Sequence, residues 1–404
     1  MRKIVIGLTI ASIAAISTLS AAAPALASNA GGTGPAIMAP QVQGPPPPPP
    51  TSGKGTRIQP DVSGYNRCEG GGGPLWTAYF KDRFHSCFLV HTGFDVVVKK
   101  DGVNVVVGNW TLRWIVTGTG YNLGQLMTFT VKSTLWDVTG VPPGPTWRWS
   151  VGLSCLNYFG STCGNNHSTG YTYDVATWSV PHTFTFLFNT SKSPGYTPDK
   201  YYNAADGLNY HAMSQWQMFP GNQASKSWSN PVYFRGDKAK YARGVGGSVF
   251  YQVIPTWKIS LSGKAAAVAK HIQLALTKPG TGSYPPAPKG KKVRIPGSVS
   301  TGQPLMRLYP AYDQTIYDAN RDTANRACVA KWGPGYSNGG KDECDEYPMA
   351  ATYEGASQAN GSPWWYSVQV LAASANGSAG GSWVQFLNNN RVLSGDPFWV
   401  AVVS

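Results

Sequence analysis

Apolar and polar residues alternate in several short runs between residues 61 and 262, which is the pattern of half-buried β-strands. Two of these runs, 94–98 and 103–107, flank an Asp-Gly pair and predict a hairpin. The remaining runs are bounded by Gly and Pro and fall at 110–116, 126–131, 147–153, 183–188 and 249–259. Their spacing predicts an N-terminal all-β, sandwich-like module over 61–262.

A different period follows this module. Val268, Ile272 and Leu276 recur every four residues and predict a helix. A stretch rich in Pro, Gly and Lys comes next, so 263–298 is assigned to a helix and a basic linker. The remaining residues, 299–404, are expected to form a second domain, which makes the chain multidomain.

The start of the chain has the features of an export signal. Two basic residues precede an apolar run at 4–22, and an A-x-A cleavage signal follows at 25–27. An uncleaved membrane anchor is the alternative, but serines and Pro24 interrupt the apolar stretch. We expect a cleaved signal peptide at 1–27 and a Pro-rich linker at 28–60. The mature protein is then secreted and extracellular, with no stable membrane association.

The six cysteines lie in three neighbouring pairs along the chain. Export makes disulfides available, and no Cys/His arrangement has the spacing of zinc ligands. The sequence does not select among the possible connectivities, and short loops are the simplest pattern. The predicted disulfides are Cys68–Cys87, Cys155–Cys163 and Cys328–Cys344.

The chain is basic, with 33 Lys and Arg against 19 Asp and Glu and a formal net charge of +14. The excess lies before residue 293, because the residues from 293 onward carry seven basic and nine acidic side chains. A strongly basic exported protein favours polyanionic partners such as nucleic acid, cell-wall teichoic acids or anionic lipid. Solubility alone is the competing interpretation of the charge.

The densest group of carboxylates is the segment D-E-C-D-E at 342–346, with Glu354 eight residues beyond it. Carboxylate oxygens bind hard divalent cations, and a carboxylate also accepts a proton from an attacking water. A solvated acidic turn beside a disulfide is the competing interpretation.

Three ordered blocks of sequence surround this acidic segment. The first is C-D-E-Y-P-M-A-A-T-Y-E-G at 344–355, the second is N-G-S-A-G-G-S-W-V at 376–384, and the third is R-V-L-S-G-D-P-F at 391–398. Together they resemble the NucA/NucB family of secreted bacterial deoxyribonucleases, and N-R-A-C at 325–328 fits the longer exported members. The resemblance implies a small α+β nuclease domain over 299–404.

The resemblance further implies a secreted, metal-dependent endonuclease that hydrolyses DNA phosphodiester bonds, with Mg²⁺ or Mn²⁺ as cofactor and DNA as partner. Carried onto this chain, Asp345, Glu346 and Glu354 are the catalytic acids. Asp345 and Glu354 are expected to bind the metal, and Glu346 is expected to orient or deprotonate the water. Asn376 is expected to contact the metal or the phosphate.

Two positions depart from the family pattern. Cys344 stands where shorter members carry a basic residue, and Gly377 stands where an arginine commonly follows the asparagine. A phosphate-binding cation is then either missing or supplied from elsewhere, and Arg391 and Lys341 are the local candidates for substrate binding.

All six histidines precede residue 293. If the second domain works alone, its base must be a carboxylate or a metal-bound hydroxide. The alternative is a histidine from the first module, with His85 and His91 as candidates because they lie near Cys87.

Two rival functions remain open on the sequence alone. The first is an extracellular, non-catalytic polyanion- or glycan-binding protein with an inactive nuclease-like tail. The second is a phosphodiesterase or RNase acting on another polyanion. The partner of the β module is equally open among DNA, a cell-wall polyanion or glycan, and an inhibitor protein.

Overall fold

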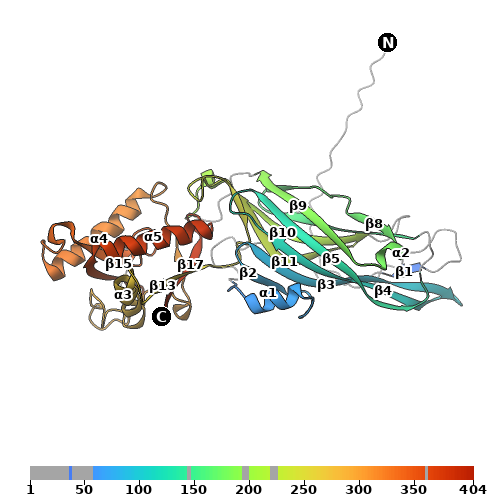
Figure 1. Cartoon of the computed structure of the whole chain (residues 1–404), viewed down its shortest axis with the longest axis horizontal. Coiled ribbons are helices and arrows are strands. Elements are labelled where there is room, and N and C mark those ends of the chain that lie inside the picture. The colour runs from blue at the N-terminus through green and yellow to red at the C-terminus, as the bar shows by residue number, and fades with distance from the viewer. Residues whose placement is uncertain (1–35, 39–57, 143–146, 193–199, 219–225, 360–362) are drawn as a thin grey trace, which may run out of the picture.

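The computed structural model describes residues 36–38, 58–142, 147–192, 200–218, 226–359 and 363–404. The predicted signal peptide and most of the predicted Pro-rich linker lie outside these residues. The described chain is mostly β, with a small α+β region at its C-terminal end, and the two bodies lie end to end (Figure 1). Along the described part of the chain, no helix has the length and apolar character needed to cross a membrane.

Two sheets form the N-terminal module. The larger sheet has the order β1-β3-β4-β5-β9-β7, with β2 paired to β3. Its strands are β1 (Ala36–Met38), β2 (Ala78–Asp82), β3 (His85–Lys100), β4 (Val103–Thr119), β5 (Leu126–Gly140), β7 (Thr162–Asn165) and β9 (His182–Lys192). The smaller sheet has the order β12-β11-β10-β6-β8. Its strands are β6 (Arg148–Asn157), β8 (Tyr171–Asp174), β10 (Asn209–Met218), β11 (Lys226–Asp237) and β12 (Gly247–Val249). The helices of the module are α1 (Val62–Glu69), α2 (Val175–Trp178) and η1 (Ala204–Asp206).

Aromatic side chains fill the space between the two sheets. Phe129 on β5 contacts Phe234 on β11 with ring centroids 5.7 Å apart, and Phe94 on β3 contacts Trp149 on β6 at 5.0 Å. All four side chains are buried in one core. Two sheets packed face to face over a shared core form a sandwich, which agrees with the sandwich-like module predicted from the alternation.

The predicted hairpin forms between β3 and β4. Asp101 and Gly102 both have positive φ, 52° and 81°, as a tight two-residue hairpin turn requires. The strands are much longer than the predicted runs, and the run at 110–116 continues β4 rather than forming a strand of its own. β1 lies within the predicted Pro-rich linker, yet it pairs with β3 at the sheet edge.

The C-terminal region contains a three-stranded sheet of order β13-β17-β14 and a separate hairpin of β15 and β16. The strands are β13 (Thr256–Ser260), β14 (Leu305–Met306), β15 (Asp342–Tyr347), β16 (Ser367–Ala372) and β17 (Pro397–Val403). The α-helices are α3 (Ala266–Thr277), α4 (Gln314–Trp332) and α5 (Ala373–Asn389). Three 3₁₀ turns are η2 (Val299–Thr301), η3 (Asn338–Gly340) and η4 (Ala356–Gln358).

β13 and α3 are part of the C-terminal region, whereas the sequence pattern placed β13 in the β module and α3 in the linker. β13 pairs in parallel with β17, the last strand of the chain. α3 forms as predicted, and its Val268 and Ile272 pack into the core around Phe398. The run at 249–259, predicted as one strand, is divided between β12 and β13, and Pro255 precedes β13. β17, the strand that pairs with β13, lies at the far end of the sequence. No local pattern therefore shows that the chain passes from the β module into the C-terminal region before β13.

All three predicted disulfides form, with Cα–Cα separations of 5.9, 6.5 and 6.1 Å. They connect α1 to β3, β6 to β7 and α4 to β15, and the cysteines are Cys68–Cys87, Cys155–Cys163 and Cys328–Cys344. The third disulfide lies in the hairpin that carries the predicted catalytic acids.

Helices cover both faces of the β15–β16 hairpin. α4 packs on one face, where Cys328 is bonded to Cys344, and α3 and α5 pack on the other. Side chains alternate between the two faces of a strand. Cys344 and Glu346 therefore point toward α4, and Glu343 and Asp345 point toward α3 and α5.

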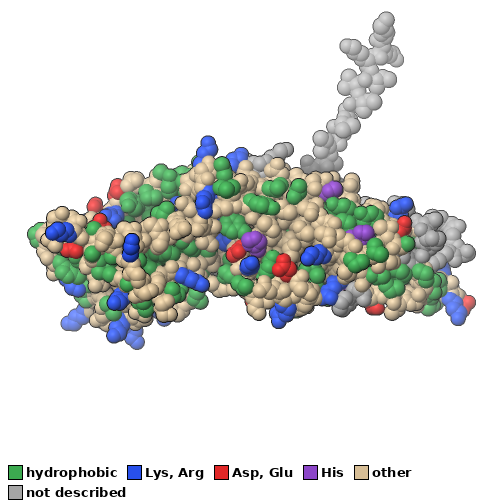
Figure 2. All heavy atoms as spheres, viewed as in Figure 1, with side chains coloured by type: hydrophobic (Ala, Val, Ile, Leu, Met, Phe, Trp, Pro, Cys, Tyr) green, Lys and Arg blue, Asp and Glu red, His purple; other side chains and the backbone are tan. Residues whose placement is uncertain are grey.

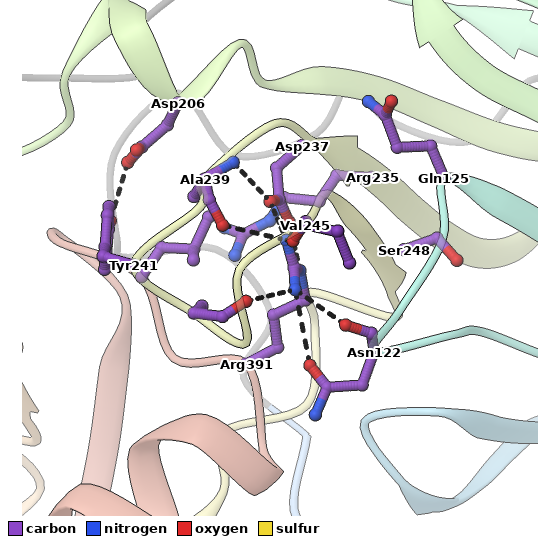
Figure 3. A network of polar contacts seen from close by, with 12 residues as sticks. Asn122, Gln125, Asp206, Arg235, Asp237, Ala239, Tyr241, Val245, Ser248 and Arg391 are labelled. Carbon is purple, nitrogen blue, oxygen red and sulfur yellow. Dashed lines mark hydrogen bonds and ion pairs between the residues drawn. The ribbon is translucent and has the colours of Figure 1, made fainter.

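Buried ion pairs join the C-terminal region to the β module. Asp396, directly before β17, binds Arg83 at 3.1 Å and Arg235 at 2.5 Å. Arg391 binds Asp237, the last residue of β11, at 2.5 Å (Figure 3). All five side chains are at most 2% exposed. The two bodies are therefore held together by charges that have almost no access to water.

Candidate active site

Asp345 and Glu346 are neighbours in the sequence but lie on opposite faces of β15. Asp345 contacts His271 of α3, and Glu346 contacts Arg321 of α4. Strand alternation is the cause, because consecutive residues of an extended chain point in opposite directions. A D-E pair on a strand therefore cannot present both carboxylates to one point on the same face.

Asp345 is held in a buried polar chain. Nδ1 of His271 lies 2.5 Å from Oδ2 of Asp345, and Nε2 of the same ring lies 2.8 Å from Oγ of Ser367 on β16. Asp345 is 6% exposed and His271 2%. His271 was not among the predicted site residues, because the second domain was expected to begin at residue 299, after α3. The signal that was available is its place three residues after Val268, on the apolar face of the predicted helix.

Glu346 occupies the α4 face with a side chain that is 10% exposed. Nη1 of Arg321 lies 3.4 Å from its Oε1, and the Arg321 side chain is 45% exposed. Burial raises the pKa of Glu346 to about 7, and the Arg321 cation acts against this rise.

Arg321 was not among the predicted site residues either, although the sequence contains a signal for it. Arg321 lies seven residues before Cys328, which is two helical turns and hence the same helix face. Glu346 lies two residues after Cys344, which is the same strand face. A disulfide between the two cysteines therefore brings Arg321 toward Glu346.

Glu354 lies in the long loop that connects β15 to β16, and its Oε2 accepts a hydrogen bond from the backbone N–H of Met306 at 2.8 Å. Asn320, buried on α4, holds this loop through hydrogen bonds to two of its carbonyls and one of its amides. Gly355 is needed because a Cβ there would lie 2.2 Å from Nδ2 of Asn320. Close packing against Asn320 therefore explains the glycine that follows Glu354.

The three predicted acids do not converge on one point. Over the part of the chain that the structure describes, the one set of three His, Cys, Asp or Glu ligand atoms within 4.8 Å of one another consists of His211 and the cysteines of the second disulfide. Those cysteines are oxidised and do not bind metal. The two residues of the predicted metal pair have different partners: Asp345 binds His271 of α3, and Glu354 binds the backbone of β14.

The α5 face of the hairpin gathers a different set of polar groups. Glu343 is exposed on the same face as Asp345, and Nδ2 of Asn376 donates a hydrogen bond to its Oε2 at 2.8 Å. The predicted Asn376 is thus brought to the acidic strand. Lys341, also predicted, is exposed directly before β15, and its carbonyl accepts a hydrogen bond from the N–H of Ala373, the first residue of α5.

Arg391 does not have the predicted role in substrate binding, because it is completely buried in the interface with the β module (Figure 3). Its Nε and Nη2 bind Asp237, and its Nη1 donates to the carbonyls of Asn122 and Ala242, both at 2.9 Å. Gly247 leaves the room that the guanidinium needs, since a Cβ there would lie 2.2 Å from Nε. Every nitrogen of this guanidinium is already engaged.

The predicted histidines of the first module have other surroundings. Nδ1 of His85 lies 2.9 Å from Asp82, its neighbour across the β2–β3 turn. His91 lies further along β3, inside the β module. The histidine that reaches the acidic hairpin is therefore His271.

These features define the class of the C-terminal region: a small α+β domain whose acidic hairpin is followed directly by a helix and tied to α4 by a disulfide. Residues 306–401 match the family model of deoxyribonuclease NucA/NucB, and this segment makes up most of the C-terminal region. A search of curated proteins and a search of solved structures found no match to the chain. The matched segment contains the hairpin and α5 but begins after β13 and α3.

Proposed function

We propose that this chain is a secreted, metal-dependent endonuclease that hydrolyses the phosphodiester bonds of DNA. The observation that carries the proposal is the match of residues 306–401 to the NucA/NucB deoxyribonucleases, since a domain of this type implies DNA as substrate. The three disulfides support export, because they persist in oxidising compartments.

The α5 face of the hairpin is the candidate centre. Asp345 is our candidate for the general base, because only its Oδ2 is engaged by His271. Its Oδ1 has no hydrogen-bond partner among the described residues and is not sealed from solvent. A carboxylate with one fixed oxygen and one open oxygen is suited to accept a proton from an attacking water. Glu346, on the opposite face, would then stabilise the contact between β15 and α4.

The chemistry of this face fits a hard divalent cation. Glu343 offers carboxylate oxygens and Asn376 offers an amide oxygen, which are the donors that Mg²⁺ and Mn²⁺ prefer. These two residues would hold the ion in place of the predicted pair Asp345 and Glu354, and Oδ1 of Asp345 would stay open to the attacking water. When bound, such an ion supplies positive charge that stabilises the phosphate as negative charge develops on it.

Phosphate contacts must come from exposed cations. Lys341 is such a cation at the start of β15, whereas Arg391 is excluded by its burial. The residues before 293 add a longer-range attraction, because the chain's excess of basic side chains lies there, in the β module and in the Lys-rich stretch that follows it. We therefore expect DNA binding to weaken steeply with added salt.

Cleavage of a supercoiled plasmid by the chain from residue 28 onward tests the proposal. We expect cleavage with Mg²⁺ or Mn²⁺ and none with EDTA. Asp345→Asn should lower the rate at least about 100-fold, the size expected when a general base is removed. Glu346→Gln is the matched control on the same strand and should cost less than about tenfold.

Three results would count against this assignment. Absence of cleavage by the folded wild-type chain with either metal would favour the non-catalytic binding protein. Equal losses in Asp345→Asn and Glu346→Gln would contradict the choice of face. Faster digestion of RNA than of DNA in a parallel reaction would change the substrate class.

A further inference from the structure

We propose that His271 is a positioning residue of the nuclease centre, supplied by a helix outside the segment that matches the nuclease family. The inference rests on the proposed function of the α5 face. It assigns a role to α3, which the sequence pattern placed in a linker, and it makes residues before 306 necessary for full activity.

The chemistry of the partner fixes the direction of the first hydrogen bond of His271. A carboxylate only accepts, so Nδ1 of the imidazole donates to Oδ2 of Asp345 across 2.5 Å. Nε2 and the hydroxyl of Ser367 form a second hydrogen bond across 2.8 Å. The two contacts hold the ring from both sides and leave Oδ1 of Asp345 directed away from the histidine. One carboxylate oxygen is therefore fixed while the other remains for chemistry.

The surroundings of His271 argue against a role in packing alone. Its neighbours on the buried face of α3 are Val268, Ile272 and Ala275, so the position lies in an apolar stripe. An apolar side chain there would avoid the cost of burying polar groups. A histidine at this position is useful because it satisfies a buried carboxylate and orients it, as outer-shell hydrogen-bond partners do in metal and catalytic sites.

α3 is held against the hairpin by its own connections. It follows β13, which pairs in parallel with β17, and it packs in the same core as Tyr347 of β15. The chain reaches β13 directly from Val253, which is part of the core of the β module. Contacts in the C-terminal region and the connection to the β module therefore both hold His271 in place.

Three substitutions of His271 in the full mature chain separate positioning from packing. His271→Asn keeps an N–H donor at the place of Nδ1, His271→Gln keeps one at the place of Nε2, and His271→Leu keeps only the volume. We expect Leu and Gln to lower kcat about 10- to 100-fold with KM unchanged, because no substrate contact is altered. The His271→Asn variant should retain most of kcat, because it keeps the N–H donor that binds Asp345. Ser367→Ala is the matched control, since it removes the other hydrogen bond of the same ring.

Two kinetic results would contradict the positioning role of His271. Wild-type kcat in folded His271→Leu, or equal losses in the Asn and Gln variants, would overturn the positioning role. Thermal unfolding of each variant identifies losses that come from misfolding. The ¹⁵N-histidine NMR spectrum gives a readout independent of activity: a protected Nδ1 proton in the wild type that is lost in Asp345→Ala. Its absence from the wild type would refute the contact, whereas its presence in a protein that does not cleave DNA would refute only the proposed function.

Discussion

The interface between the two bodies and the acidic hairpin both bury carboxylates, but they supply partners differently. In the interface, Asp396 faces two arginines, Arg83 and Arg235, and all three side chains are at most 2% exposed. In the hairpin, Glu346 faces one arginine that is 45% exposed, and Asp345 faces a histidine. Asp396 is bound by two buried cations, whereas neither acid of the hairpin is.

The difference in partners reverses the effect of burial on the two acids. Burial by itself would raise the pKa of Asp396, but the attraction of Arg235 and Arg83 lowers it to about 2. Burial raises the pKa of Glu346 to about 7, because the half-exposed cation of Arg321 lowers this pKa by less than burial raises it. Burial therefore does not decide whether an acid is charged at neutral pH; the number and burial of its cations do.

The comparison also separates structure from chemistry. Both oxygens of Asp396 are occupied by arginine side chains, so this acid has no capacity left for a substrate, and its role is to fix how the two bodies meet. A site for chemistry needs a group that is held but incompletely satisfied, as Asp345 is. The same distinction explains why Arg391, which the sequence offered as a phosphate ligand, belongs to the interface.

Removal of Asp396, the acid that Arg83 and Arg235 share, should break the interface and give the largest loss of stability. Asp396→Ala leaves Arg83 and Arg235 buried without a counter-charge, and we expect the free energy of unfolding to fall by about 3–5 kcal/mol. Urea denaturation measures this loss. Asp318→Ala, which removes an exposed acid of α4, is the control and should change stability by less than about 0.5 kcal/mol. Coincident curves for Asp396→Ala and the wild type would show that the interface does not hold the fold together.

Glu346 should make the free energy of unfolding depend on pH in the opposite sense from a carboxylate whose pKa is lowered by a salt bridge, such as Asp396. The folded state binds the Glu346 proton more tightly than the unfolded chain does, because its pKa rises from 4.5 to about 7. Stability from this group is present below pH 4.5 and is lost as the pH rises to 7, by an amount on the order of 3 kcal/mol. Glu346→Gln should remove this slope from urea denaturation curves measured between pH 4.5 and 8.

Arg321 sharpens the same prediction. Because the Arg321 cation lowers the pKa of Glu346, Arg321→Met should move the upper end of the slope above pH 7. An unchanged slope in Glu346→Gln would mean that another group is responsible.

The smallest effect is expected at the exposed cation of the hairpin. Lys341→Met should weaken DNA binding only a few-fold and reduce the slope of log K against log salt by about 1, the signature of one lost phosphate contact. Binding to a short duplex at several salt concentrations in EDTA measures this slope without cleavage. A slope equal to that of the wild type would show that Lys341 does not contact phosphate.

Much of the β module was predictable because its signals are local. Strand alternation, the Asp101-Gly102 turn and the short disulfide loops each concern residues near one another in the sequence, and all three are present in the structure. The nuclease type of the C-terminal region was also predictable, because the motif blocks are contiguous in the sequence. Strand lengths were underestimated, since the predicted runs captured only the most apolar part of each strand.

The constellation around Asp345 was decided by tertiary structure alone. The residues of the acidic motif are contiguous in the sequence, but their partners come from far along the chain. His271 lies 74 residues from Asp345, and Asp237 lies 154 residues from Arg391. Local periodicity says which side of an element is buried, not which distant side chain meets it there. The sequence by itself thus determined the elements and the resemblance to the nuclease family, whereas the packing of α3 and of the β module decided which distant side chain each buried acid meets.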